Sequence, residues 1–187
     1  MKIRKTLVGL TVSVLSAISI AQVLNIYKAE AEVVTAPNSE QAVCRKFFAG
    51  TYLTTISDST GQFASRAIIT LTIDGNIVVT DSNQGGVYQG ENQFNPFTTS
   101  QGSWKCNNGK VIATTLDFNL SGPLPLASNP LAIAGQRYRI SFNQSTQTLQ
   151  GTIELRFFDL NATVQEATGS AGVPLTFTFT GQRVPAK

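Results

Sequence analysis

Apolar and polar side chains alternate with a period of two along most of the chain. Such alternation predicts β-strands with two chemically different faces, because successive side chains of a strand point to opposite sides. Eight runs have this character, and they cover residues 50–57, 63–73, 77–81, 97–106, 110–120, 137–143, 149–159 and 175–182. No helical pattern of comparable length occurs after residue 32, so we expect an all-β protein.

Turn signals separate these runs. The clearest is Asn107-Asn108-Gly109, because Asn and Gly tolerate the positive φ angles of a tight hairpin turn. Residues 82–95 are rich in Gly, Asn and Gln and predict a long loop. Residues 122–134 contain three prolines and are interpreted as an apolar loop, since proline cannot donate a hydrogen bond within a central strand.

Eight antiparallel strands joined mostly by short turns can close into an up-and-down barrel, which leaves no exposed sheet edge. The expected fold class is therefore all-β, with a single antiparallel eight-stranded barrel. A barrel of this size is either filled by side chains or wide enough to hold one small ligand.

The beginning of the chain has the organisation of a secretory signal peptide. Residues 1–5 are basic, residues 6–24 are mostly apolar, and Ala29-Glu30-Ala31 is an A-x-A cleavage site. We divide the chain into a signal peptide (1–31), a flexible lead-in (32–43) and a β-barrel domain (44–187). The protein is expected to be exported, either secreted or periplasmic, with no membrane span after signal cleavage. The alternative is an uncleaved anchor helix, since the apolar stretch approaches the length of a bilayer span.

The charge balance argues against a nucleic-acid partner. Only 13% of the residues are charged, and the formal net charge is +3. Four of the basic residues lie before the cleavage site: Lys2, Arg4, Lys5 and Lys28. Removal of residues 1–31 leaves basic and acidic residues in equal number, so no basic field remains to attract phosphate.

The chain contains two cysteines, Cys44 and Cys106. In an oxidising compartment such a pair usually joins, so we expect a disulfide between them, the alternative being two separate thiols. With no histidine and only two cysteines, the usual four-ligand zinc sites cannot be assembled, and we expect neither a metal nor a cofactor.

Candidate catalytic chemistry is limited by the absence of histidine, which excludes Ser-His-Asp and Cys-His machinery. The carboxylates of Asp117, Glu154 and Asp159 lie in or at the end of predicted strands. We interpret them as outward groups that solvate a strand face, because proton transfer would need a buried acid that faces a ligand cavity. No catalytic residue is assigned.

Four residues are candidates for ligand binding: Trp104, Arg137, Tyr138 and Arg139. Arg137 and Arg139 lie on the strand face opposite to Tyr138, and as a pair they could hold an anionic ligand. The alternative interpretation is structural, with the two arginines on a solvated face and Tyr138 in the core.

Two short motifs resemble the lipocalin or calycin arrangement. Gly50-Thr51-Tyr52 opens the first predicted strand as G-x-aromatic, and Gly181-Gln182-Arg183 closes the last one with an arginine. The resemblance implies that the aromatic ring packs under this arginine across the closed end of the barrel, with Tyr52 in place of the usual tryptophan. The segments G-S-W, A-T-T-L-D-F and T-G-Q-R are also similar to uncharacterised exported bacterial β-barrel proteins, which implies fold and export only.

The function expected from these features is a non-enzymatic binding module for a small apolar or amphipathic ligand. Its entrance would be lined by the loops 85–95 and 124–131. One alternative is a small-barrel enzyme of the cyclase or isomerase kind, with Asp117, Glu154 or Tyr138 as its polar groups. The other is a structural or interaction protein with a filled interior. The oligomeric state is left open.

Overall fold

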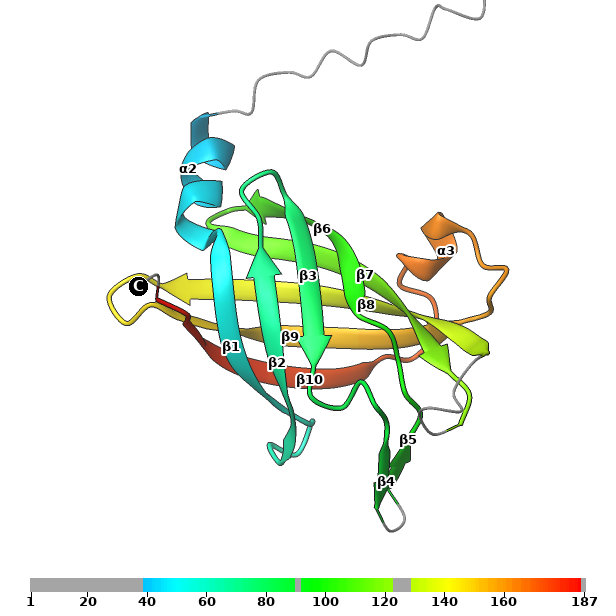
Figure 1. Ribbon diagram of the computed structural model, residues 1–187. Helices are drawn as coiled ribbons and strands as arrows, with labels where there is room; N and C mark the ends of the chain where they lie inside the picture. Colours follow the sequence, from blue (N-terminus) through cyan, green and yellow to red (C-terminus); the bar gives the residue numbers. More distant parts are fainter. Residues whose placement is uncertain (1–38, 90–91, 123–128, 186–187) are drawn as a thin grey trace, which may run out of the picture. The chain divides into compact units, whose positions relative to one another are not determined.

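The computed structural model describes residues 39–89, 92–122 and 129–185. The expected signal peptide, residues 32–38 of the lead-in and most of the loop 124–131 lie outside the described residues. Eight strands form one closed antiparallel barrel (Figure 1). They are β1 (Gly50–Ser57), β2 (Phe63–Leu71), β3 (Asn76–Asp81), β6 (Ser100–Asn107), β7 (Lys110–Leu120), β8 (Pro130–Asn143), β9 (Thr148–Phe158) and β10 (Leu175–Arg183).

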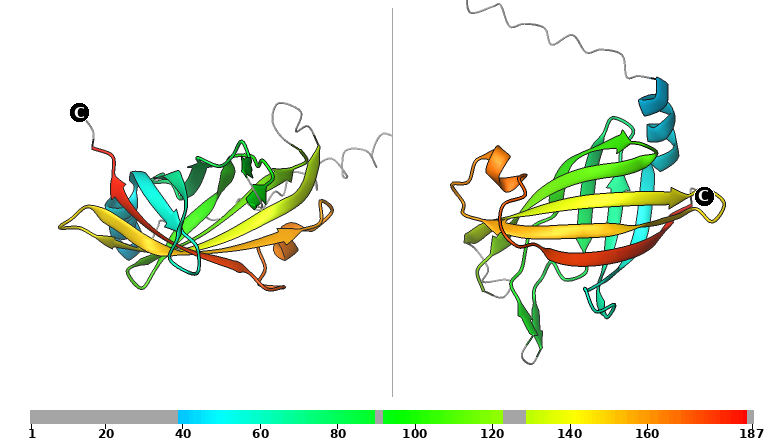
Figure 2. Two further views of the ribbon diagram at one scale, coloured as in Figure 1. Left: turned by 90° about the horizontal axis from the view of Figure 1, so that it is seen from below. Right: turned by 180° about the vertical axis from the view of Figure 1, so that it is seen from behind.

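The barrel has up-and-down topology, because each strand pairs with the next barrel strand in the sequence and β10 pairs with β1. The predicted all-β eight-stranded barrel is confirmed. The turn between β6 and β7 has the predicted positive φ angles, 50° at Asn108 and 70° at Gly109. Figure 2 shows β8, β9 and β10 running side by side along one wall of the barrel.

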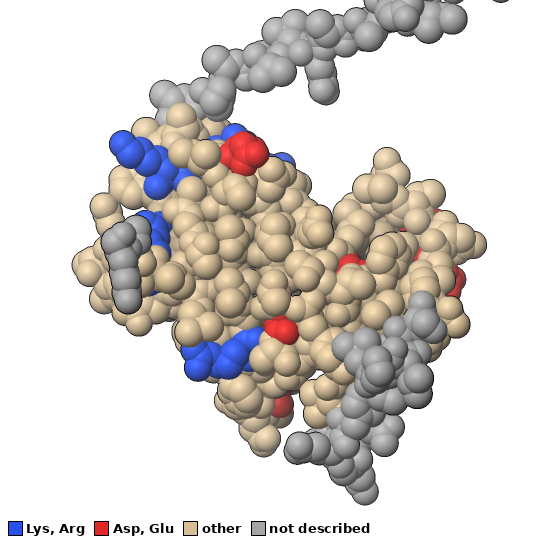
Figure 3. All heavy atoms as spheres, viewed as in Figure 1, with Lys and Arg blue, Asp and Glu red and all other residues tan. Residues whose placement is uncertain are grey.

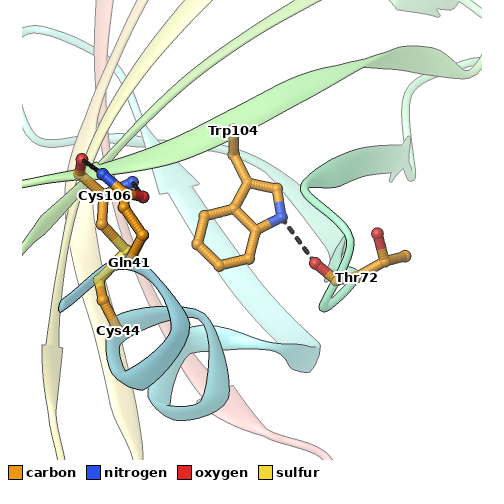
Figure 4. The surroundings of a disulfide bond; sticks show 5 residues. All are labelled: Gln41, Cys44, Thr72, Trp104 and Cys106. Carbon is orange, nitrogen blue, oxygen red and sulfur yellow. Dashed lines mark hydrogen bonds between the residues drawn. A yellow bond between two sulfur atoms is a disulfide. The ribbon is translucent and has the colours of Figure 1, made fainter. Parts of the chain in front are cut away.

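A helix that the sequence analysis did not predict lies against one end of the barrel, which we call the helix end. This helix, α2 (Ser39–Phe48), overlaps the expected lead-in. With ten residues it is too short to be stable alone in water, so contacts with the barrel stabilise it. The side-chain amide of Gln41 donates to the carbonyl of Cys106 at 2.8 Å and accepts from the Cys106 N–H at 3.3 Å (Figure 4).

The predicted disulfide joins α2 to β6 at the helix end. Cys44 and Cys106 are bonded, with 6.3 Å between their Cα atoms, and they are 62 positions apart in the sequence. The disulfide and the Gln41 amide attach two residues of α2 to the same residue of β6, Cys106 (Figure 4).

Arg183 closes the helix end through contacts with three elements. Its guanidinium carbon lies 5.2 Å from the ring centroid of Tyr52 in β1 and 4.8 Å from that of Phe142 in β8. Its Nε donates to the Tyr52 hydroxyl at 3.1 Å, and its Nη2 donates to the carbonyl of Phe47 in α2. The Tyr52 hydroxyl donates in turn to the carbonyl of Phe48 at 2.8 Å. The contact between aromatic ring and arginine that the resemblance implied is therefore present.

The interior of the helix end is filled by apolar side chains. The following have no exposed surface: Tyr52, Ile69, Ile77, Val111, Ile140 and Leu149. Trp104 is also buried there, and its Nε1 donates to the carbonyl of Thr72 at 3.0 Å (Figure 4). A side chain without accessible surface cannot line a space that admits a water molecule, so these residues form a solid core.

Two expected loops contain regular structure. Residues 82–95 include a short hairpin of β4 (Val87–Gln89) and β5 (Asn92–Phe94), separate from the barrel. Residues 130–134 belong to β8, so their interpretation as loop was wrong. Pro130 is tolerated because it is the first residue of the strand and pairs with Leu120 alone, whereas pairing with β9 begins at Ile133.

A short helix, α3 (Val164–Ala167), lies near the end of the barrel opposite to α2 (Figures 1 and 2). A capping box begins it, in which Thr163 and Glu166 bond each other's backbone N–H. It packs on the outer face of β8, where a side chain at Gly135 would collide with the carbonyl oxygen of Ala167 at 2.2 Å.

The disulfide predicts a large loss of stability on its removal. The double variant Cys44→Ala/Cys106→Ala should lose about 4 kcal/mol of unfolding free energy, because a bond that closes a loop of this length restricts the unfolded chain. Urea denaturation followed by the fluorescence of Trp104 measures this loss, and the reduced wild type should match the variant. A loss below about 1 kcal/mol would contradict the estimate.

The contacts of Arg183 predict that lysine cannot replace it. Arg183→Lys should lower the unfolding free energy by roughly 1–3 kcal/mol, because an ammonium group neither stacks as a plane nor reaches both oxygens. Arg139→Lys is the matched control, since Arg139 is exposed on the outer face of β8 and its replacement should change stability by less than about 0.5 kcal/mol. Equal effects of the two substitutions would contradict the role of Arg183.

Candidate functional site

The barrel interior becomes polar at the end opposite to α2, which we call the loop end. Strand alternation points several polar side chains inward there, near the ends of five strands. They are Ser65 of β2, Asp81 of β3, Ser100 of β6, Thr115 and Asp117 of β7, and Gln136 and Tyr138 of β8. We refer to these seven residues as the polar cluster.

Hydrogen bonds within the polar cluster converge on Asp117. The Ser100 hydroxyl and the Gln136 amide both donate to Oδ2 of Asp117, each at 2.6 Å. The hydroxyls of Thr115 and Tyr138 donate to Oε1 of Gln136 at 2.6 and 2.9 Å. The second oxygen of Asp117, Oδ1, is buried and has no hydrogen-bond partner among the described residues.

Asp117 corrects the sequence analysis, which interpreted it as an outward carboxylate. Its exposed fraction is only 4%, and it faces the interior with Val111, Ala113 and Thr115. Burial raises the pKa of Asp117, and the hydrogen bonds from Ser100 and Gln136 oppose this rise only in part. A buried carboxyl group with a raised pKa in a polar cluster is a typical feature of a functional site.

Asp81 is a second carboxylate of the cluster, at the rim of the loop end. Its oxygens accept from the Ser65 hydroxyl at 2.7 Å and from the backbone N–H of Asn83 at 2.8 Å. Burial raises the pKa of Asp81 as well. The pKa of Tyr138 is also raised, mainly by burial and further by the charges of Asp117 and Asp81, so the tyrosine remains a neutral hydrogen-bond donor.

Half-exposed apolar side chains border the polar cluster on the β9 and β10 side. Phe157 of β9 is 51% exposed and Leu175 of β10 is 53% exposed. Both lie on the inward face by alternation with Ile153, Leu155 and Phe179. The loop end therefore places apolar surface next to buried carboxylates. Charged side chains are sparse on the face of the molecule shown in Figure 3.

The other predicted site residues are not part of this cluster. Arg137 and Arg139 lie on the outer face of β8, so they are separated from Tyr138 by the sheet itself. Trp104 belongs to the solid core of the helix end. The four candidate ligand-binding residues thus lie in three different places, and only Tyr138 is in the polar cluster.

Glu154 and Asp159 lie outside the barrel interior, as expected. Glu154 forms an ion pair with Arg156 at 3.1 Å on the outer face of β9, and Asp159 is exposed. Three members of the cluster with prominent roles, Asp81, Ser100 and Gln136, had no signal in the sequence beyond their positions in predicted strands or at strand ends.

A groove of about 620 Å³ lies at the helix end, between α2 and the β6–β7 turn. Val43, Phe47, Phe142 and Asn108 are among its lining residues, and none of its lining side chains is charged. It can offer apolar contact and amide hydrogen bonds, but it holds no group for acid–base chemistry. The carboxylates make the loop end the better candidate site.

The fold and the site define a class: a closed eight-stranded antiparallel barrel with a disulfide-linked helix at one end and a polar cluster at the other. Comparisons with protein-family models, with curated proteins and with solved structures found no match.

Within residues 39–89, 92–122 and 129–185, no three metal-binding side chains lie close enough together to hold an ion. In the same part of the chain, no helix is long and apolar enough to cross a membrane.

The burial of Asp117 predicts a pH-dependent stability. Because its pKa is raised on folding, the folded protein holds the proton more tightly than the unfolded chain. This stabilisation is complete below the unfolded pKa and is lost as the pH rises through the folded pKa. Wild type should therefore lose unfolding free energy as the pH rises above the pKa of an unfolded aspartate, about 4, and Asp117→Asn should lose less of it.

At pH 7 the unfolding free energy of Asp117→Asn should equal that of wild type or exceed it by up to about 2 kcal/mol. The reason is that the substitution removes a buried charge that is only partly hydrogen-bonded. Urea denaturation at several pH values measures both quantities. Asp159→Asn is the control, since Asp159 is exposed, and it should follow the wild-type pH dependence. An Asp117→Asn protein less stable than wild type at pH 7 would mean that the carboxylate serves folding.

Proposed function

We propose that the protein is an exported binding module that holds a small amphipathic ligand at the loop end of its barrel. The observation that carries the proposal is the position of Asp117 beside the half-exposed apolar side chains of β9 and β10. Asp117 is a buried carboxylate, and one of its oxygens has no hydrogen-bond partner within residues 39–89, 92–122 and 129–185. Binding sites for small molecules typically combine apolar walls with a few converging polar groups.

The cost of burying Asp117 supports a functional role. An apolar residue at this position would extend the core without a desolvation penalty, whereas a buried carboxylate lowers stability unless all its oxygens are hydrogen-bonded. Residues that lower the stability of a fold are commonly retained for binding or catalysis.

The ligand is assigned to the loop end because the barrel interior at the helix end is filled by side chains and the groove outside it has no charged lining residue. The zero accessible surface of residues such as Ile69, Ile77 and Val111 leaves no cavity between them. The site is therefore shallower than the full length of the barrel, and a ligand would occupy the space between the polar cluster and the rim.

Export and a calycin-like character complete the proposal. The A-x-A motif at 29–31 and the disulfide support export, because disulfides persist in oxidising compartments. The stacking of Arg183 on Tyr52 at the end where α2 packs supports a calycin-like closure of the barrel.

A small-barrel enzyme of the cyclase or isomerase kind is a second candidate, which the burial of Asp117 favours. A carboxyl group with a raised pKa keeps its proton to a higher pH than an exposed aspartate, and the Tyr138 hydroxyl lies two hydrogen bonds away through Gln136. In that case Asp117 would act as the acid or base, and Tyr138 would orient it through Gln136.

Binding of a neutral fluorescent dye such as Nile red tests the proposed site. The dye should bind wild type saturably, and Phe157→Asn/Leu175→Asn should weaken binding about tenfold or more, because apolar contact area is lost at the loop end. Val43→Asn/Phe47→Asn, which changes exposed apolar residues of the helix-end groove, is the control and should leave binding unchanged.

Absence of saturable binding, or equal weakening by both double variants, would contradict the proposed site. Native mass spectrometry of the protein purified from its exported fraction should show a retained small molecule. A retained species that the protein converts into an isomer on incubation would favour the enzyme over the binding module.

A further inference from the structure

In the polar cluster the hydroxyl donors are already used within the cluster, whereas one acceptor oxygen remains free among the described residues. The hydroxyls of Ser65, Ser100, Thr115 and Tyr138 each donate to another member of the cluster. The Gln136 amide gives one of its N–H groups to Asp117 as well. Oδ1 of Asp117, by contrast, is an acceptor without a partner in the described part of the chain, on a side chain that is 4% exposed.

The charge of the cluster is also one-sided. Asp81 and Asp117 both face the interior, and both act on the same tyrosine, Tyr138. The arginines near the loop end lie on outer faces: Arg66 is exposed between the buried Ser65 and Ala67, and Arg156 is paired with Glu154. Among the described residues, no inward-facing lysine or arginine compensates the two carboxylates at this end.

We infer that the polar end of the ligand is a protonated amine that donates to Oδ1 of Asp117, while its apolar part lies against Phe157 and Leu175. This inference rests on the proposed function and names the class of ligand. An ammonium group supplies both missing elements, a hydrogen-bond donor and a positive charge, whereas an alcohol supplies only the donor. A carboxylate supplies neither, and the two aspartates would repel it.

The register of β7 and β8 places Asp117 at the loop-end side of Gln136, because Asp117 lies opposite Ala134 and Gln136 lies opposite Thr115. Asp81 and Gln136 are half-buried, whereas Ser100 and Asp117 are buried. An amine that enters at the loop end would therefore reach the level of Asp117 before that of Gln136. The apolar residues that flank this route suit an unbranched alkyl chain better than a compact polar amine.

Three single-chain amphiphiles of equal length test the inference: dodecylamine, dodecanol and dodecanoate, each below its micellar concentration at pH 7. Displacement of Nile red from the protein without residues 1–31 measures their affinities. Dodecylamine should bind at least about tenfold more tightly than dodecanol, and dodecanoate should bind most weakly.

Asp117→Asn should abolish the preference for dodecylamine over dodecanol, because it removes the carboxylate that the ammonium group contacts. Asp159→Asn, which removes an exposed carboxylate outside the cluster, is the control for net charge and should keep the preference for the amine. Nile red affinity and urea denaturation show that each variant is folded.

The outcomes separate this inference from the proposed function. If Nile red and dodecanol bind but the amine is not preferred, or if the preference survives in Asp117→Asn, the amine assignment is overturned and the binding module stands. If ammonium chloride displaces dodecylamine at equal concentration, the site binds a bare cation and the amphiphile is overturned. If none of the probes binds saturably, the proposed function itself fails.

Discussion

The contact of the Arg183 guanidinium with two aromatic rings is the interaction on which the organisation of the barrel depends. It joins the last strand, the first strand, β8 and the backbone of α2 in one place. Because Arg183 hydrogen-bonds Tyr52 and a helix carbonyl, a long cationic side chain closes the helix end without leaving its charge in a dry interior. The apolar core beneath it is thereby sealed from water.

This closure gives the two ends of one barrel different chemistry. At the helix end, close packing of the barrel interior leaves its core residues without accessible surface. At the loop end, inward positions carry hydroxyl, amide and carboxylate groups, and one oxygen of Asp117 has no hydrogen-bond partner among the described residues. Stability is concentrated where the disulfide and the aromatic contacts lie, and a carboxylate that costs stability is tolerated at the other end.

The strands were predictable because the alternation of apolar and polar residues is a local property of the sequence. The disulfide was predictable because two cysteines allow only one pairing. The face of each strand was not predictable from hydrophobicity alone. In β7 the larger apolar side chains, such as Ile112, Leu116 and Phe118, point outward, whereas Asp117 points inward. Barrel closure decides the face, and it depends on partners far away in the sequence. The helix α2 was not predictable for the same reason, because contacts with Cys106, which is distant in the sequence, stabilise its helical conformation.

Closure of β10 on β1 has a further consequence for how the chain folds. Tyr52 and Arg183 are 131 positions apart, so the barrel cannot close until almost all of its strands are present. Such non-local pairing is slow, typically in the range of about milliseconds to seconds. During that interval β1 and β9 each expose an unpaired edge that can template association with another chain. If the disulfide between Cys44 and Cys106 forms before the barrel closes, it shortens this interval, because it holds β1 near the middle strands while β10 is still unpaired.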